Sequence, residues 1–215
     1  MSTKKDFKNV LSPSTFEVLN TLSEIEEIKN FTLVGGSALS IYLHHRISED
    51  LDFFTWNDKL EAAGIDALVK KTGLVYPVKI INTYADGVDL LINNIKVTFF
   101  ANYWERLKER EDLIQNSYIG TLELITAMKT NALSMRAAFR DYYDLYVITK
   151  TSFDIKRVLD IALEYIPGMT RKIFAMQLIY TDDIYDEDIT HLHPVHKVTL
   201  DDIRSFFENE LKKIV

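Results

Sequence analysis

The stretch from residue 76 to 100 limits the fold more than any other part of the chain. It is rich in β-branched and aromatic residues, and two turn signals, Asp86-Gly87 and Asn93-Asn94, divide it into short segments. Two-residue turns of this kind join neighbouring antiparallel strands. The stretch therefore predicts a β-meander, with strands at residues 78–84, 88–92 and 95–100.

The chain before the meander alternates between helix and strand signals. Ser12-Pro13 places a capping hydroxyl before a proline at the first helical position. A short apolar strand at residues 31–34 runs into Gly35-Gly36, and Ser37 is expected to cap the helix that follows. A second buried strand is expected at residues 51–54 and a further helix at 58–71.

Beyond about residue 101 the composition becomes helical to the end, with a long periodic helix expected from Thr121. The chain contains no internal repeat and no flexible linker. We therefore predict an α+β fold, in which a core domain at residues 1–105 includes the N-terminal helix. A helical domain at residues 106–215 is expected to pack on that core.

Composition excludes several classes of protein. None of the 215 residues is cysteine, so disulfide frameworks and thiolate metal sites are excluded. The 25 basic and 32 acidic residues give a net charge of −7, which argues against broad nonspecific binding to nucleic acid. No apolar run suits a signal peptide or a membrane span, so we expect a cytoplasmic protein that does not enter membranes.

The turn at Gly35-Gly36-Ser37 joins a strand to the start of a helix. Glycines let a backbone approach a phosphate closely, and a helix N-terminus offers N–H groups and a favourable dipole. The same three residues also occur in ordinary turns. Alone, they indicate a phosphate site only weakly.

Two carboxylates follow at Asp50 and Asp52. Residues two apart in a strand share a face, and a cation such as Mg²⁺ would relieve the repulsion between their charges. The alternative is a solvated strand end. The segment 182–188 contains the same spacing at Asp186 and Asp188, and we expect it to be a solvated loop without a function.

Three cations, Lys129, Arg136 and Arg140, recur at steps of seven and four residues. In one continuous helix this spacing would place them on one face, where they could clamp an anionic substrate. The alternatives are an exposed face, or pairing with Asp141 and Asp144.

Three histidines, His191, His193 and His196, crowd one segment and have a spacing that can bind Zn²⁺ or Ni²⁺. Pro194 lies among them and indicates a surface loop. We favour the loop over a metal site.

Taken together, the helix-opening Gly-Ser and the Asp-x-Asp of the next strand resemble the nucleotidyltransferase superfamily that includes DNA polymerase beta. The finer pattern resembles the AbiEii/AbiGii-type nucleotidyltransferase toxin family. The matching motifs lie in the family's order at Leu33–Leu39, His45–Ser48, Asp50–Phe54, Ala127–Lys129, Asn131-Ala132, Arg136 and Arg140–Tyr146.

This resemblance implies a mixed sheet flanked by helices and a metal-dependent transfer of an NMP from an NTP to a hydroxyl acceptor, with pyrophosphate leaving. RNA such as tRNA is the acceptor of some family members, and a cognate antitoxin is a further implied partner. Asp50, Asp52 and Lys129 are the implied catalytic residues, and the two aspartates would bind Mg²⁺ or Mn²⁺. The expected nucleotide-binding residues are Gly35, Gly36, Ser37, Arg46, Lys129, Arg136 and Arg140. Asp141 and Asp144 match a later acidic motif that either positions the basic residues or supports the fold.

One position departs from the superfamily pattern. A third carboxylate normally lies on a later strand, and Thr98 occupies the matching position here. If Asn93-Asn94 is a two-residue turn, Asp89 lies directly opposite Thr98 on the same face of the sheet. We therefore consider that Asp89 supplies the missing carboxylate, the alternative being an exposed aspartate without a role.

Two other functions remain open on the sequence alone. The first is an inactive module that binds a nucleotide or a partner, which Thr98 favours. The second is a small-molecule nucleotidylyltransferase resembling antibiotic-modifying enzymes.

Overall fold

The computed structural model describes Phe7, residues 9–101 and residues 110–214. The chain divides into two compact units, Met1–Thr121 and Leu122–Val215. Among the described residues, no helix has both the length and the apolar character needed to cross a bilayer.

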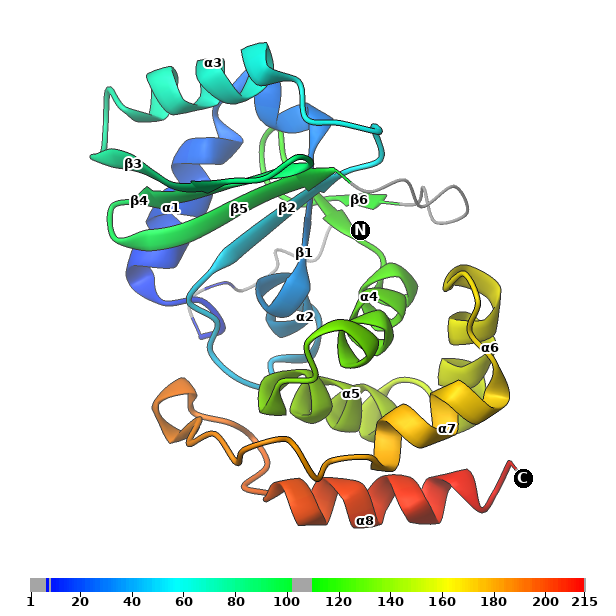
Figure 1. Cartoon of the computed structure of the whole chain (residues 1–215). Coiled ribbons are helices and arrows are strands. Elements are labelled where there is room, and N and C mark those ends of the chain that lie inside the picture. The colour runs from blue at the N-terminus through cyan, green and yellow to red at the C-terminus, as the bar shows by residue number, and fades with distance from the viewer. Residues whose placement is uncertain (1–6, 8, 102–109, 215) are drawn as a thin grey trace. The chain divides into compact units, whose positions relative to one another are not determined.

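The first unit contains a seven-stranded sheet and the helices around it (Figure 1). Its elements are α1 (Pro13–Ser23), η1 (Glu26–Asn30), β1 (Thr32–Val34), α2 (Gly35–Leu43), β2 (Leu51–Thr55), α3 (Ala62–Thr72), β3 (Val78–Thr83), β4 (Gly87–Ile92), β5 (Ile95–Ala101), β6 (Arg110–Asp112) and β7 (Tyr118–Gly120). The strand order is β3-β4-β5-β2-β1-β7-β6. The pairs β2–β5 and β1–β7 are parallel and the others are antiparallel, so the sheet is mixed and the predicted α+β class is confirmed.

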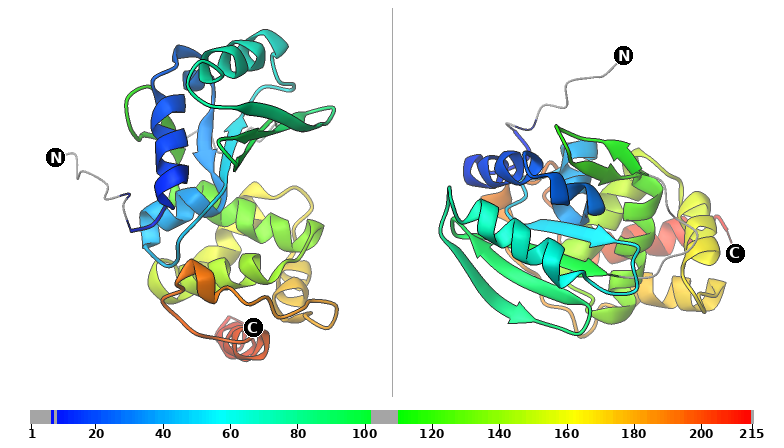
Figure 2. Two further views of the ribbon diagram at one scale, coloured as in Figure 1. Left: turned by 90° about the vertical axis from the view of Figure 1, so that its left-hand side faces the viewer. Right: turned by 90° about the horizontal axis from the view of Figure 1, so that it is seen from above.

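The predicted meander is confirmed, including its register. Asn93 and Asn94 have φ values of 48° and 64°, as a type I′ hairpin turn requires, and Ile92 pairs with Ile95. β3 and β4 run side by side at one edge of the sheet (Figures 1 and 2). The register also places Asp89 opposite Thr98, as expected.

The apolar core of this unit lies on the sheet face that carries Leu33, Phe53 and Phe99, each with no measurable exposure. The Phe53 and Phe99 rings stack with centroids 5.2 Å apart, and Phe31 meets Phe99 edge-on at 4.9 Å. α1 packs on β5 and contacts α3 and η1. Its predicted start is confirmed, because Ser12 accepts a hydrogen bond from the Thr15 N–H.

The first unit extends past the predicted boundary at residue 105. β6 and β7 join the sheet at residues 110–120, where a purely helical region was expected, and the compact unit ends at Thr121. Both strands are only three residues long, and β7 pairs with β1 from the other end of the unit. So short a strand, paired over such a distance in sequence, leaves almost no periodic signal.

The second unit is helical. Its elements are α4 (Leu122–Met135), α5 (Phe139–Thr151), α6 (Ile155–Tyr165), α7 (Arg171–Ile179), η2 (Thr190–Leu192) and α8 (Leu200–Leu211). Tyr142, Tyr143, Phe174 and Phe207 are fully buried in its core. Burial raises the pKa of Tyr142 to about 12, and its hydroxyl donates to the carbonyl oxygens of Gln177 and Tyr180.

The long helix expected from Thr121 is interrupted. α4 ends at Met135, Ala137 takes a left-handed conformation with φ of 42°, and α5 begins at Phe139. No glycine or proline lies between the start of α4 and the end of α5, so the periodicity alone predicted one continuous helix.

Candidate active site

The two glycines at the start of α2 leave space for charged side chains. A Cβ atom at Gly35 would collide with the Asp52 carboxylate, and Gly35 also has a left-handed φ of 70°. A Cβ at Gly36 would lie 2.6 Å from a guanidinium nitrogen of Arg46. The glycines therefore bring a carboxylate and a guanidinium directly against the first turn of α2.

The first turn of α2 has features that suit an anionic ligand. α2 begins at Gly35 itself, with Val34 as its N-cap and no side-chain cap. The first N–H groups of a helix have no partner inside it, and together with the helix dipole they attract anions. The backbone arrangement is thus the one expected of a phosphate site.

Ser37 does not cap the helix as predicted. It is the third residue of α2, is 1% exposed, and its hydroxyl donates to the backbone carbonyl oxygen of Asp50. The proton of this hydroxyl is therefore used within the chain. Ser37 holds the segment that carries Asp50 against α2.

Asp50 and Asp52 lie where β2 begins. The strand starts at Leu51, so Asp50 precedes it by one residue and is exposed, while Asp52 is half-buried. Proteins usually bind Mg²⁺ through one or two carboxylates together with substrate phosphates and water. Two carboxylates beside a helix N-terminus without a side-chain cap fit that mode of binding.

A row of polar side chains crosses the sheet from Asp52. Asp52 pairs with Thr98 in β5, and Thr98 pairs with Asp89 in β4. Paired residues share a face of a sheet, so all three lie on the face opposite the phenylalanine core. The predicted position of Asp89 is therefore correct as far as the face is concerned.

The Asp89 carboxylate is buried and surrounded by donors. It accepts hydrogen bonds from the Thr98 hydroxyl at 2.9 Å, the Tyr84 hydroxyl at 2.6 Å and the Asn82 amide at 3.5 Å, and the Lys96 ammonium lies 3.5 Å away. Burial opposes ionisation, but the Tyr84 and Thr98 hydrogen bonds and the Lys96 charge outweigh it. The pKa of Asp89 consequently lies below its ordinary value.

These contacts do not support Asp89 as a direct replacement for the third carboxylate. Within the described parts of the chain, no three His, Asp or Glu residues are arranged to hold one metal ion, so Asp89 does not form such a group with Asp50 and Asp52. The reason is its position two strands away from β2, with both oxygens facing local donors.

The second unit places Lys129 in a buried charge cluster. Its ammonium lies 3.0 Å from Asp141 and 2.6 Å from Asp144, and the three residues are 6%, 1% and 0% exposed. Asp141 also accepts two hydrogen bonds from Arg136, from its Nε at 2.9 Å and a terminal nitrogen at 3.0 Å. Burial opposes ionisation of Asp141, but the charge of Lys129 and the contact with Arg136 outweigh it and lower its pKa. Both carboxylates thus contact Lys129, and Asp141 also contacts Arg136, an arrangement that fits both roles considered for them.

The predicted stripe of Lys129, Arg136 and Arg140 is wrong. The break at Ala137 separates α4 from α5, so the three residues do not share one helix face. The Arg136 side chain remains 68% exposed beyond its contact with Asp141. Arg140 instead pairs with Glu187, at 2.6 Å and 2.8 Å.

The acidic segment 182–188 is more than a solvated loop. Besides the pair with Arg140, Asp186 accepts a hydrogen bond from the Leu200 N–H and Asp188 accepts from the Thr190 N–H and hydroxyl. The end of the segment also lines an open pocket of about 440 Å³, whose lining residues are Phe139, residues 186–190, Pro194 and residues 196–199. His196 lines this pocket and packs edge-on against Tyr146, with ring centroids 5.7 Å apart, and no metal-binding group of histidines occurs among the described residues.

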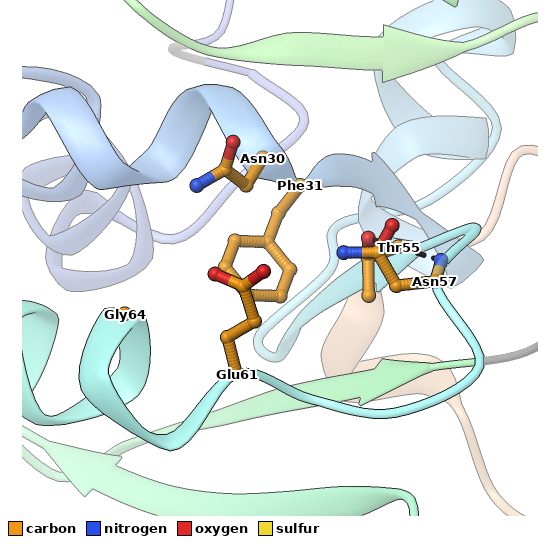
Figure 3. Close-up of a pocket in the computed structure, with 6 residues that line it drawn as sticks. All are labelled: Asn30, Phe31, Thr55, Asn57, Glu61 and Gly64. Carbon is orange, nitrogen blue, oxygen red and sulfur yellow. Dashed lines mark hydrogen bonds between the residues drawn. The ribbon is translucent and has the colours of Figure 1, made fainter.

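A small cavity lies at the other end of β2. Figure 3 shows the Phe31 ring beside the Glu61 side chain, with Thr55 and Asn57 nearby. Its volume of about 10 Å³ is enough for one water molecule only. Because β1 and β2 are antiparallel, this cavity is at the end of the strands remote from Asp52 and Gly35.

Comparisons with known proteins bear on this arrangement. Residues 17–79 match the family model described as nucleotidyl transferase AbiEii toxin, type IV toxin–antitoxin system. An uncharacterized protein of Aquifex aeolicus strain VF5 is 26% identical over 203 residues, which span 92% of this chain and 94% of that protein.

Two solved structures resemble the whole chain. MenT4, a nucleotidyltransferase toxin of Mycobacterium tuberculosis H37Rv, superposes with a TM-score of 0.57 at 14% identity over 92% of this chain and 81% of MenT4. JHP933 of Helicobacter pylori gives a TM-score of 0.54 at 16% identity over 94% of this chain and 92% of JHP933. The chain thus has the fold of these proteins, and its match over residues 17–79 confirms the resemblance to the AbiEii nucleotidyltransferase toxins.

Proposed function

We propose that this chain is a metal-dependent nucleotidyltransferase that moves an NMP from an NTP to a hydroxyl group of RNA. The observation that carries the proposal is the first turn of α2, which begins at Gly35 without a side-chain cap and against which Gly35 and Gly36 bring Asp52 and Arg46. The family match includes all four residues. A helix N-terminus beside two carboxylates suits a triphosphate that arrives with a divalent cation.

Each group has a separate task in this proposal. The N–H groups of the first turn of α2 and the Arg46 guanidinium bind the phosphates, and Ser37 holds Asp50 in place through the Asp50 carbonyl. Asp50 and Asp52 would hold Mg²⁺ or Mn²⁺. When bound, the ion neutralises charge on the phosphates and helps to orient the attack on the α-phosphorus.

The basic groups of the second unit complete the proposal. Lys129 is proposed to contact the triphosphate, in keeping with the helical lysine of the family resemblance, and Arg136 presents an exposed guanidinium beside it. The net charge of −7 requires RNA to be recognised by a confined basic face. We also propose a toxin-like role with a cognate antitoxin as partner, and a cytoplasmic location, which the use of NTPs and the absence of cysteine favour.

The direct test is a transfer assay. The chain is incubated with each radiolabelled NTP, Mg²⁺ and unfractionated bacterial tRNA, and label in the RNA and released pyrophosphate are measured together. We expect both products in equal amounts with at least one NTP, and loss of both in Asp50→Ala. Absence of transfer with every NTP would contradict the proposal.

A nucleotide-binding module without catalysis is the second candidate, and Thr98 favours it because a threonine cannot act as a carboxylate. This candidate predicts NTP binding without pyrophosphate release in the same samples.

A further inference from the structure

The Thr98 hydroxyl has a fixed orientation. An ionised carboxylate carries no proton and only accepts hydrogen bonds. Thr98 must therefore donate its single proton to Asp89, across the 2.9 Å contact between Thr98 Oγ1 and Asp89 Oδ1. Its oxygen lone pairs are left facing away from Asp89.

Thr98 is the neighbour of the candidate metal ligand Asp52 in the sheet. Thr98 is the residue directly paired with Asp52 in the β2–β5 register, and neighbouring strands lie about 4.8 Å apart. Thr98 and Asp52 are both half-buried, whereas Asp89 behind them is 4% exposed. A ligand that approaches Asp52 along this face thus meets Thr98 as an oxygen that can only accept a hydrogen bond.

The other neighbours of Asp89 hold its carboxylate in this ionised, hydrogen-bond-accepting state. Tyr84 and Lys96 engage its other oxygen, Oδ2, which leaves Oδ1 for Thr98. A hydroxyl that rotates freely would offer both a donor and an acceptor. Because the Thr98 proton is committed to Asp89, the Thr98 hydroxyl offers other groups an acceptor only.

We propose that Thr98 Oγ1 accepts a hydrogen bond from the attacking hydroxyl of the acceptor substrate, and that Asp89 is a positioning residue that orients Thr98 for this contact. The inference rests on the proposed nucleotidyl transfer and deepens it. It assigns to Thr98, which occupies the position of the superfamily's third carboxylate, a function in aligning the acceptor. It also predicts that the site takes an acceptor that carries a hydrogen on its attacking oxygen.

The test compares four variants in the tRNA transfer assay under single-turnover conditions. Thr98→Val removes the hydroxyl and keeps the shape, and we expect the transfer rate to fall about tenfold, the equivalent of one hydrogen bond. Thr98→Ser keeps the hydroxyl and should restore the rate to within about twofold. Asp89→Asn, whose amide can donate to Thr98, should lower the rate as much as Thr98→Val.

Thr83→Val is the matched control. It makes the same substitution at an exposed threonine of β3 that has no part in the proposed contact, so its rate should stay within about twofold of wild type. The affinity for the NTP, measured by calorimetry, should be unchanged in every variant, since the proposed contact is with the acceptor. Thermal unfolding verifies that each variant is folded.

A double mutant separates positioning from a purely structural role. If Asp89 acts through Thr98, Asp89→Asn should add no further loss of rate to Thr98→Val. Full additivity of the two losses, or a wild-type rate in Thr98→Val, would overturn the inference while transfer by the wild type still upheld the proposed function. Absence of transfer by the wild type would overturn both.

Discussion

The start of α2 in the first unit and the charge cluster of the second unit were both predicted to contact the nucleotide, yet their charges are held differently. Asp50 is exposed and Asp52 is half-buried. In contrast, Lys129, Asp141 and Asp144 are nearly inaccessible, and the Lys129 ammonium lies within 3.0 Å of both carboxylates. The two sets of charged residues thus differ in their surroundings: the carboxylates at α2 are accessible to solvent, whereas those around Lys129 are buried in mutual ion pairs.

The largest effect is expected from Gly35→Ala. The new methyl group would require a left-handed alanine and would collide with the Asp52 carboxylate, so NTP binding should be abolished and the melting temperature lowered. Gly64→Ala in α3 is the matched control, because nothing lies within 4 Å of its Cβ position. That variant should be neutral or more stable by up to about 1 kcal/mol. Equal behaviour of the two variants would refute the packing described at α2.

Lys129→Met should be the next most damaging change. It leaves two buried carboxylates without their shared cation, and breaking such a buried ion pair costs about 3–5 kcal/mol. Urea unfolding measures this loss. Lys156→Met, at an exposed position in α6, should change stability by less than about 0.5 kcal/mol. A stability near wild type for Lys129→Met would show that the cluster does not stabilise the fold. Contact with the substrate would then be the whole role of Lys129.

The same cluster should respond to acid. The pKa of Asp141 lies below its ordinary value of 3.8 in the folded chain, so its contribution to stability is complete above that value and is lost as the pH falls through the folded pKa. The free energy of unfolding should therefore decrease more steeply toward about pH 3 in wild type than in Asp141→Asn. Parallel pH profiles of the two proteins would argue against an ionised, paired Asp141.

The smallest effect is expected from Arg140→Ala. Its partner Glu187 is on the surface, and pairs of this type contribute about 0–1 kcal/mol. Affinity for the NTP should stay within about twofold of wild type, measured by calorimetry. A loss of tenfold or more would restore Arg140 to the nucleotide site that the sequence suggested.

Local signals were the most reliable guide to this fold. Asn93-Asn94 was sufficient to predict the hairpin and the pairing of Asp89 with Thr98, because a two-residue turn fixes the register of its strands. The cap at Ser12 was predicted correctly because a hydroxyl directly before a proline at the first helical position is also a local signal.

Two helix boundaries and several contacts between distant segments were not predicted. The start of α2 was misplaced by three residues, because Gly35 enters the helix with a positive φ that a turn would also explain. The break at Ala137 carries no helix-breaking residue, and the pairing of β7 with β1 depends on contacts between distant segments. At the site, the partners of Arg140 and Ser37 could be identified only in three dimensions.

Calorimetric titration with each of the four NTPs, with and without Mg²⁺, tests the central claim most directly. Asp50→Ala is the informative variant because Asp50 is exposed, and Glu49→Ala is the matched control at the neighbouring exposed carboxylate. The account predicts Mg²⁺-dependent binding of at least one NTP by wild type and Glu49→Ala, and none by Asp50→Ala. No binding by wild type, or equal binding by Asp50→Ala, would contradict the nucleotide site at the start of α2.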